Sequence, residues 1–220
     1  SLQHPNILSV RSLEILKDGR IAFSMPLMVG NLKDVIIDAQ FSKSHIKSWA
    51  IDMLSALDYL HNQPKPYYHR DIKPSNLLVD KDQTVFLADF GIARKDGDIR
   101  LTRTAEQLGS LPYMAPELLL GSEANAASDR FALAVSLHEL ITGQLPSKTE
   151  VGQGIEGDFG LFIRELGAND PVKRLQAKWS PSKPLLLTTE VSGGQKPLED
   201  QPPQGSILSK EAPSTNPMHE

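Results

Sequence analysis

Four polar residues in the middle of the sequence have the types and spacing that phosphoryl transfer requires. Asp71 and Lys73 are separated by one residue, and Asn76 follows the aspartate by five positions. Asp89 lies a short distance further along. A carboxylate can orient a hydroxyl and accept its proton, a lysine can neutralise phosphate charge, and an Asn/Asp pair can hold magnesium. Together these residue types predict transfer of a phosphoryl group to a hydroxyl.

The tripeptides around these residues identify a family. His-Arg-Asp at 69–71, Asp-Phe-Gly at 89–91 and Ala-Pro-Glu at 115–117 follow one another in this order. With these motifs the chain resembles the catalytic domain of eukaryotic-type (Hanks-type) serine/threonine protein kinases. The resemblance implies ATP and Mg²⁺ as cofactors, a protein substrate, and transfer of the γ-phosphate to its Ser or Thr hydroxyls.

The resemblance also assigns roles to the four polar residues. Asp71 matches the catalytic base and Lys73 the lysine that neutralises the transferring phosphate. Asn76 and Asp89 match the two magnesium ligands. Taken singly, each has a structural explanation, such as a capping aspartate, a solvated surface lysine or a turn asparagine. Those explanations weaken because the separations are the ones that the family uses.

A second group of residues is expected to bind the nucleotide. By position Met25 matches the gatekeeper, and Pro26 and Met28 lie in the hinge that contacts adenine through backbone groups. Proline lacks an N–H, but only the carbonyl of Pro26 and the N–H of Met28 are needed. Asn31 is expected at a ribose hydroxyl and Leu78 against the adenine. The alternative is a simple connection from a strand to a helix.

Segment 92–114 resembles an activation loop. Thr102 and Thr104 are candidate phosphorylation sites, because Arg70 can pair bidentately with a phosphothreonine. Full activity of a Thr102→Ala/Thr104→Ala double variant would contradict this. Ser110 occupies the place of the Ser or Thr in the substrate loop of Ser/Thr kinases. The alternative is that these are ordinary polar loop residues.

Five further residues are predicted to be structural. His69 and Phe90 belong to a stacked apolar column in the family, so His69 is not expected to act as a base. Glu117 and Arg174 match a buried ion pair. Asp129 matches the residue that braces the catalytic loop.

Apolar periodicity and turn residues predict the supporting elements. A hairpin, a long helix, a second hairpin and three further helices are expected at 11–25, 42–62, 77–88, 129–142, 156–166 and 171–178. Ser128 is a plausible N-cap of the helix at 129–142, and Gly143 ends it. That helix is apolar on most sides and is therefore expected to be buried.

These elements predict an α+β, protein-kinase-like fold that consists mainly of the helical C-terminal lobe. Residues 1–178 are expected to form a partial kinase domain, with a remnant hairpin and hinge of the N-terminal lobe at 1–30 and the C-terminal lobe at 31–178. Neither a Gly-rich phosphate loop nor the family's strand lysine precedes the hairpin. The segment 143–170 is also short for the helices that the family places there. Residues 179–220 are Pro-rich and predicted to be a disordered tail or linker.

Composition narrows the remaining classes. The chain has 220 residues, a formal charge of −4 and no cysteine, so a disulfide framework, a thiolate zinc site and a cysteine nucleophile are excluded. No apolar run reaches membrane-spanning length, and the start lacks a signal pattern. A cytoplasmic protein that does not bind nucleic acid or span a membrane is predicted, and family analogy suggests self-association for autophosphorylation.

Two other functions remain open from the sequence. The chain is alternatively a non-catalytic, kinase-like interaction module, although it keeps every acidic catalytic residue. A small-molecule phosphotransferase of the kinase-like fold would share the Asp, Asn and Asp core. It would resemble this chain poorly in the activation loop and at Ala-Pro-Glu 115–117.

Overall fold

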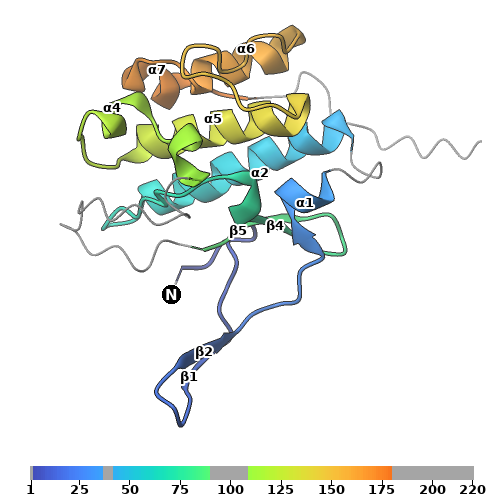
Figure 1. Ribbon diagram of the computed structural model, residues 1–220, viewed down its shortest axis with the longest axis vertical. Coiled ribbons are helices and arrows are strands. Elements are labelled where there is room, and N and C mark those ends of the chain that lie inside the picture. Colours follow the sequence, from blue (N-terminus) through green and yellow to red (C-terminus); the bar gives the residue numbers. More distant parts are fainter. Residues whose placement is uncertain (1, 37–41, 90–108, 180–220) are drawn as a thin grey trace, which may run out of the picture. The chain divides into compact units, whose positions relative to one another are not determined.

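The computed structural model describes residues 2–36, 42–89 and 109–179 (Figure 1). The chain divides into two compact units, Ser1–Pro181 and Ser182–Glu220. All described residues belong to the first unit, so the fold below is that of this unit. Apart from its first residue, the predicted Pro-rich tail lies outside the described residues.

The hairpin predicted near the start of the chain is confirmed. Strands β1 (Ser12–Ile15) and β2 (Ile21–Ser24) pair antiparallel. The turn between them contains Gly19 at φ 81°, a conformation that glycine adopts without steric cost. The large apolar side chains on the two strands are exposed by 59% to 74%: Leu13, Ile15, Ile21 and Phe23. The hairpin therefore contributes none of these side chains to the core of the described residues.

The second sheet joins three segments that are far apart in the sequence. Its order is β3 (Gly30–Asn31), β4 (Leu77–Val79) and β5 (Val85–Leu87), with both pairs antiparallel. The β4–β5 hairpin matches the predicted one. Ile7 adds a parallel bridge to Leu87, so the N-terminal segment also packs on this sheet. Residues on either side of the catalytic motifs are thereby fixed to one another.

The long predicted helix is confirmed as α2 (Lys43–His61). Ser42 precedes it in extended conformation, and its backbone N–H donates to the His45 ring over 3.0 Å. A short helix, α1 (Leu32–Val35), precedes α2 and was not predicted. The apolar face of α2 lies in the core through Ile46, Trp49, Ala50, Met53, Ala56, Leu57 and Leu60.

Helix α5 (Ala126–Thr142) is longer at its start than the sequence suggested. Ser128 is not the N-cap: Asn125 is, and its side-chain oxygen accepts from the amides of Ala127 and Ser128. The Ser128 hydroxyl in turn accepts from the Asn125 amide, which completes a capping box. Asparagine and serine are both good N-cap residues, so residue type alone did not separate Asn125 from Ser128. Gly143 ends the helix as predicted, at φ 72°.

The remaining helices are shorter. They are the 3₁₀ turns η1 (Pro74–Asn76) and η2 (Leu111–Tyr113), and the helices α4 (Pro116–Leu119), α6 (Gly157–Leu166) and α7 (Pro171–Gln176). The predicted helices at 156–166 and 171–178 are thus present within narrower bounds. Helix α5 packs against α2 on one side and against α6 and α7 on the other (Figure 1).

One hydrophobic core runs through these layers. Helix α5 supplies its centre, with fully buried side chains at Phe131, Leu133, Ala134 and Val135. Strands β4 and β5 add Leu77, Val79, Val85 and Leu87, and α6 adds Phe159, Phe162, Ile163 and Leu166. None of the helices in the described part of the chain is long and apolar enough to cross a bilayer.

Candidate active site

The segment that carries Asp71 is attached to the buried helix α5 through Asp129. The Asp129 carboxylate accepts from the backbone N–H of His69 over 2.8 Å and from that of Arg70 over 2.9 Å. It also lies 2.9 Å from Nε2 of His61, on the last turn of α2. The side chains of Asp129 and His61 are 2% and 8% exposed. A buried carboxylate with these partners fixes the backbone immediately before Asp71.

The side chain of His69 ties the same segment to the end of β5. Burial lowers the pKa of His69, so its ring is neutral at neutral pH. Its Nε2 lies 2.9 Å from the carbonyl oxygen of Ala88. A carbonyl can only accept, so Nε2 carries the hydrogen in this tautomer. The Ala88 N–H donates to the Asn76 carbonyl over 3.0 Å. The Nε2–H group of His69 is thereby used in a hydrogen bond to the end of β5.

Three predicted side chains meet around Asp71: Lys73, Asn76 and Ser110. The Asn76 amide donates to the Asp71 carboxylate over 2.9 Å and to the Asp71 backbone carbonyl over 2.7 Å. The Lys73 ammonium lies 3.0 Å from the same carboxylate. It also donates to the Ser110 hydroxyl over 2.9 Å. The 3₁₀ turn η1 ends at Asn76, and the Asn76 side chain reaches back to Asp71.

These contacts set the protonation state of Asp71. Burial raises the pKa of the Asp71 carboxyl, but hydrogen bonds from Ser110, Lys73 and Asn76 outweigh it and hold the pKa below its usual range. The carboxylate is therefore ionised at neutral pH. An ionised, half-buried carboxylate with donors on one side can accept a proton from a hydroxyl presented on the other.

Asn76 and Asp89 carry side-chain oxygen atoms of the kind that could hold a magnesium ion. Because the Asn76 amide nitrogen is used by Asp71, its side-chain oxygen is left as the donor for a cation. Asp89 is exposed and its backbone is left-handed, at φ 57°. Within the described ranges no group of three or more His, Cys, Asp or Glu side chains is arranged so that it could hold a metal ion. Two oxygen ligands fit Mg²⁺, which keeps several waters, better than a transition metal.

The predicted nucleotide residues are brought together in part. Asn31 on β3 lies directly opposite Leu78 on β4, and the Val29 N–H donates to the Val79 carbonyl over 2.8 Å. The Asn31 side chain caps α1: it accepts from the Asp34 amide over 3.1 Å and donates to the Asp34 carboxylate over 2.7 Å. A ribose hydroxyl would therefore bind an Asn31 side chain that is also hydrogen-bonded to Asp34 of α1.

The predicted hinge residues connect β2 to β3. Met25 is 44% exposed, and Pro26 and Met28 are half-buried. The backbone groups proposed to bind adenine thus lie in an open segment between two strands.

Comparison with known proteins decides the family. A family model described as "Protein kinase domain" matches residues 1–181. The chain belongs to the protein kinase family. This confirms the resemblance drawn from the His-Arg-Asp, Asp-Phe-Gly and Ala-Pro-Glu tripeptides.

The kinase domain has relatives in bacteria and yeast. It is 36% identical over 159 residues to serine/threonine-protein kinase PknJ of Mycobacterium tuberculosis, which covers 70% of this chain and 26% of that protein. It is 34% identical over 146 residues to probable serine/threonine-protein kinase PknB of Lactococcus lactis, covering 66% and 23%. Serine/threonine-protein kinase CHK1 of Saccharomyces cerevisiae is 35% identical over 176 residues, covering 75% and 32%. The matches span about a quarter to a third of these relatives.

Glu117 and Arg174 form an ion pair inside the kinase domain. Two hydrogen bonds, of 2.6 and 2.9 Å, join the guanidinium to the carboxylate. The Arg174 side chain is fully buried and the Glu117 side chain is 17% exposed. Burial raises the pKa of Glu117, but the hydrogen bonds from Arg174 lower it overall. The pair fastens α4 to α7.

Three of the predicted residues lie outside the described ranges. They are Phe90 in the Asp-Phe-Gly tripeptide and the two candidate phosphorylation sites, Thr102 and Thr104. Arg70, their proposed partner, is described: its backbone is left-handed at φ 70°.

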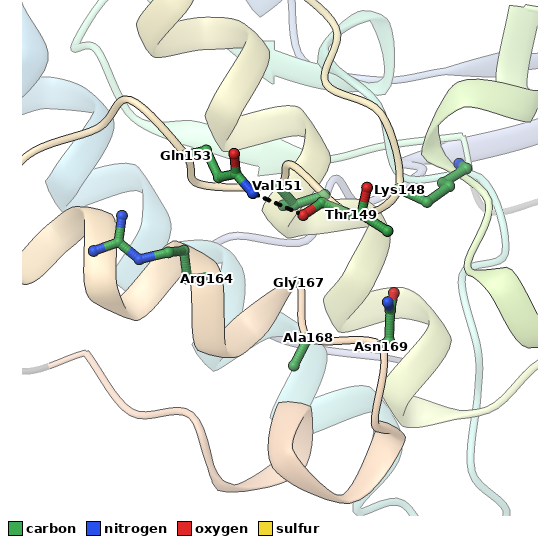
Figure 2. A pocket seen from close by; sticks show the side chains of 8 residues that line it. All are labelled: Lys148, Thr149, Val151, Gln153, Arg164, Gly167, Ala168 and Asn169. Carbon is green, nitrogen blue, oxygen red and sulfur yellow. Dashed lines mark hydrogen bonds between the residues drawn. The ribbon is translucent and has the colours of Figure 1, made fainter.

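The kinase domain contains a Gly-x-Gly-x-x-Gly sequence that does not form a phosphate loop. It lies at 152–157, between helices α5 and α6. The Gly152 N–H donates to the His138 ring over 3.0 Å, and its carbonyl accepts from Arg164 over 3.0 Å. A Cβ at Gly152 would lie 2.7 Å from the Arg164 backbone nitrogen. Figure 2 shows Arg164 on α6, its guanidinium pointing away from the pocket beside this loop. Gly152 therefore permits close packing of this loop on α6.

Two contacts of the site were not anticipated from the sequence. His61 binds Asp129, and Lys148 binds the segment that follows Ser110. His61 could have been noted, since it ends a predicted helix shortly before the His-Arg-Asp tripeptide. Lys148 has no such signal, because it is one lysine in a polar loop.

An Asp129→Asn variant is expected to be less stable by about 1–3 kcal/mol, because the new amide NH₂ faces buried N–H donors that need an acceptor. Urea denaturation of the 220-residue chain, followed by the fluorescence of its two tryptophans, Trp49 and Trp179, measures the change. Asp82→Asn, at an exposed turn, is the matched control and should leave the midpoint unchanged. Equal midpoints for the two variants would contradict the bracing role.

Proposed function

We propose that this kinase domain transfers the γ-phosphate of ATP to serine and threonine hydroxyls of proteins. The observation that carries the proposal is the arrangement around Asp71. An ionised carboxylate lies beside a lysine that also contacts Ser110, in the loop expected to receive the substrate. The relatives' names, which specify serine/threonine-protein kinases, support the same reaction.

Each residue then has a step. Asp71 accepts a hydrogen bond from the substrate hydroxyl, orients its oxygen toward phosphorus and takes its proton as the new P–O bond forms. Lys73 offsets negative charge on the transferring group while it holds Ser110 in place. Asn76 and Asp89 would hold Mg²⁺, which neutralises charge on the ATP phosphates when bound. ADP leaves with the bonding electrons of the broken P–O bond.

Nucleotide binding and domain organisation are part of the same proposal. Met25, Pro26 and Met28 would bind adenine, with Leu78 packed against it and Asn31 near the ribose. Residues 1–30 would belong to the smaller lobe and 31–178 to the larger one. The pairing of β3 with β4 supports the proposed nucleotide site, since Asn31 and Leu78 lie across from each other.

The test is phosphoryl transfer by the full-length protein. ATP labelled on the γ-phosphate, Mg²⁺ and a general protein substrate are supplied, and phosphoamino-acid analysis identifies the acceptor. Label on serine or threonine that depends on Asp71 is the expected result. ATP-independent binding of a protein without any transfer would favour a non-catalytic module, and label on a small alcohol or amine would favour a small-molecule phosphotransferase.

Residues 1–220 alone are expected to transfer little or no phosphate. The sequence before the β1–β2 hairpin supplies neither a Gly-rich loop nor the strand lysine of the family, and phosphate positioning supplies much of the catalysis. The same labelled-ATP assay on these 220 residues measures it. Robust Asp71-dependent turnover would contradict this expectation.

A further inference from the structure

Lys148 reaches from the loop between α5 and α6 to the segment that follows Ser110. Its ammonium donates to the carbonyl of Leu111 over 3.0 Å and to that of Met114 over 2.7 Å, and also contacts the carbonyl of Pro112. Figure 2 shows the side chain extending away from the other residues that line the neighbouring pocket. One side chain thus gathers three carbonyls of η2 and its flank.

The chemistry of this contact favours a charged lysine. An ammonium has three N–H donors, which equals the number of carbonyls around it. The Lys148 nitrogen also lies 5.4 Å from the centre of the buried Phe131 ring, within the range of a cation–π interaction. Lys148 therefore connects η2 to the core helix α5, because the Phe131 ring is held in the core.

The segment held by Lys148 has two other attachments. Ser110 accepts from Lys73 at one end, and the Tyr113 hydroxyl donates to Glu139 of α5. Lys148 binds the carbonyls between and after these points. Its removal would free the backbone that places Ser110 beside Lys73 and Asp71, while both outer attachments remain.

We propose that Lys148 is a positioning residue: it fixes the backbone at 111–114 and thereby sets the KM for the protein substrate. The inference rests on the proposed kinase function for its kinetic part. Lys148 itself lies apart from the reacting atoms, so it acts through the loop that the substrate contacts. Its loss should therefore raise the KM for the protein substrate more than it changes kcat or the KM for ATP.

Protonation gives the contact a pH dependence. Burial lowers the pKa of Lys148 to about 8. Above that pH the neutral amine has two N–H groups for three carbonyls, and its lone pair faces oxygen. The substrate KM is therefore expected to rise as the pH passes through 8. The titratable and charged groups on the surrounding elements include Tyr113, His138, Glu139, Glu150, Arg164 and Arg174.

Kinetics of the full-length protein test the proposal. Lys148→Met is expected to raise the KM for a protein substrate by about tenfold, the effect of losing a charge-assisted hydrogen bond. Lys148→Arg should keep the KM low and abolish its rise above pH 8, because arginine stays protonated. Lys81→Met removes a lysine that is 83% exposed and serves as the matched control. An unchanged substrate KM in Lys148→Met would overturn the proposal.

Hydrogen exchange separates this inference from the proposed function. Backbone amides at 110–115 should exchange faster in Lys148→Met than in the wild type, Lys148→Arg or Lys81→Met, with amides of α2 and α5 unchanged. Unchanged exchange at 110–115 would overturn the positioning role of Lys148 even in an active enzyme. If Lys148→Met exchanges faster at 110–115 but the wild type transfers no phosphate, the attachment of this backbone by Lys148 is supported and the proposed function is overturned. Equal acceleration throughout α2 and α5 would show general destabilisation and overturn the positioning role.

Discussion

Replacing Asp71 with asparagine is expected to reduce phosphorylation of a protein substrate by a factor of roughly 10² to 10⁴, the contribution of a positioned general base. The carboxylate is ionised, because hydrogen bonds from Ser110, Lys73 and Asn76 hold its pKa low. An asparagine of the same shape keeps an acceptor oxygen but has no basic oxygen to take the proton. The reduction should therefore appear in kcat, with the KM for ATP nearly unchanged.

The measurement is initial-rate transfer from labelled ATP by the full-length protein. Asp82→Asn is the control, since it removes an exposed carboxylate from the β4–β5 turn and should keep full activity. Tryptophan fluorescence of both variants during urea denaturation checks that their folds are equally stable. Full activity of Asp71→Asn would remove Asp71 from the mechanism and would favour a different acceptor of the proton.

Replacing Arg174 with methionine is expected to destabilise the kinase domain by about 3–5 kcal/mol, the cost of removing one partner from a buried ion pair. All five N–H groups of the Arg174 guanidinium have acceptors. They are both oxygens of Glu117 and the carbonyls of Ala127, Ala168 and Asn169. Methionine fills part of the volume over Phe131 but leaves the Glu117 carboxylate without its cation.

Urea denaturation of the 220-residue chain measures this loss. The matched control is Arg20→Met, which breaks a pair whose arginine and aspartate side chains are 77% and 51% exposed. An exposed pair contributes about 0–1 kcal/mol, so Arg20→Met should leave the midpoint almost unchanged. Similar midpoints for Arg174→Met and Arg20→Met would show that burial adds nothing to the Glu117–Arg174 pair.

The segment that carries Asp71 was predictable because its polar residues are close in the sequence. Asp71, Lys73 and Asn76 lie within six consecutive residues, so their mutual geometry follows from local backbone conformation. The long helix at 42–62 and the hairpin at 77–88 were predictable for a related reason: apolar periodicity and turn residues are local signals. The family followed from the order of the tripeptides.

Contacts between distant segments were not predictable in the same way. The bond between Lys148 and the carbonyls at 111–114 depends on how the α5–α6 loop passes over η2. His61 reaches Asp129 only because α2 and α5 pack side by side. The start of α5 was misplaced because Asn125 and Ser128 are both good caps, and their capping box uses both. Contacts between residues far apart in the chain produce no periodic pattern in the sequence.

The length of helix α5 sets the distance between two parts of the site. Asp129 near its start holds the backbone of His69 and Arg70, and Glu139 near its end holds Tyr113 of η2. Inserting one residue between them would turn Glu139 by about 100° relative to Asp129 and shift it by about 1.5 Å along the axis. The two contacts would then be out of register whatever the inserted residue was. The length of this stretch is therefore expected to tolerate change less than the identities of the apolar residues inside it.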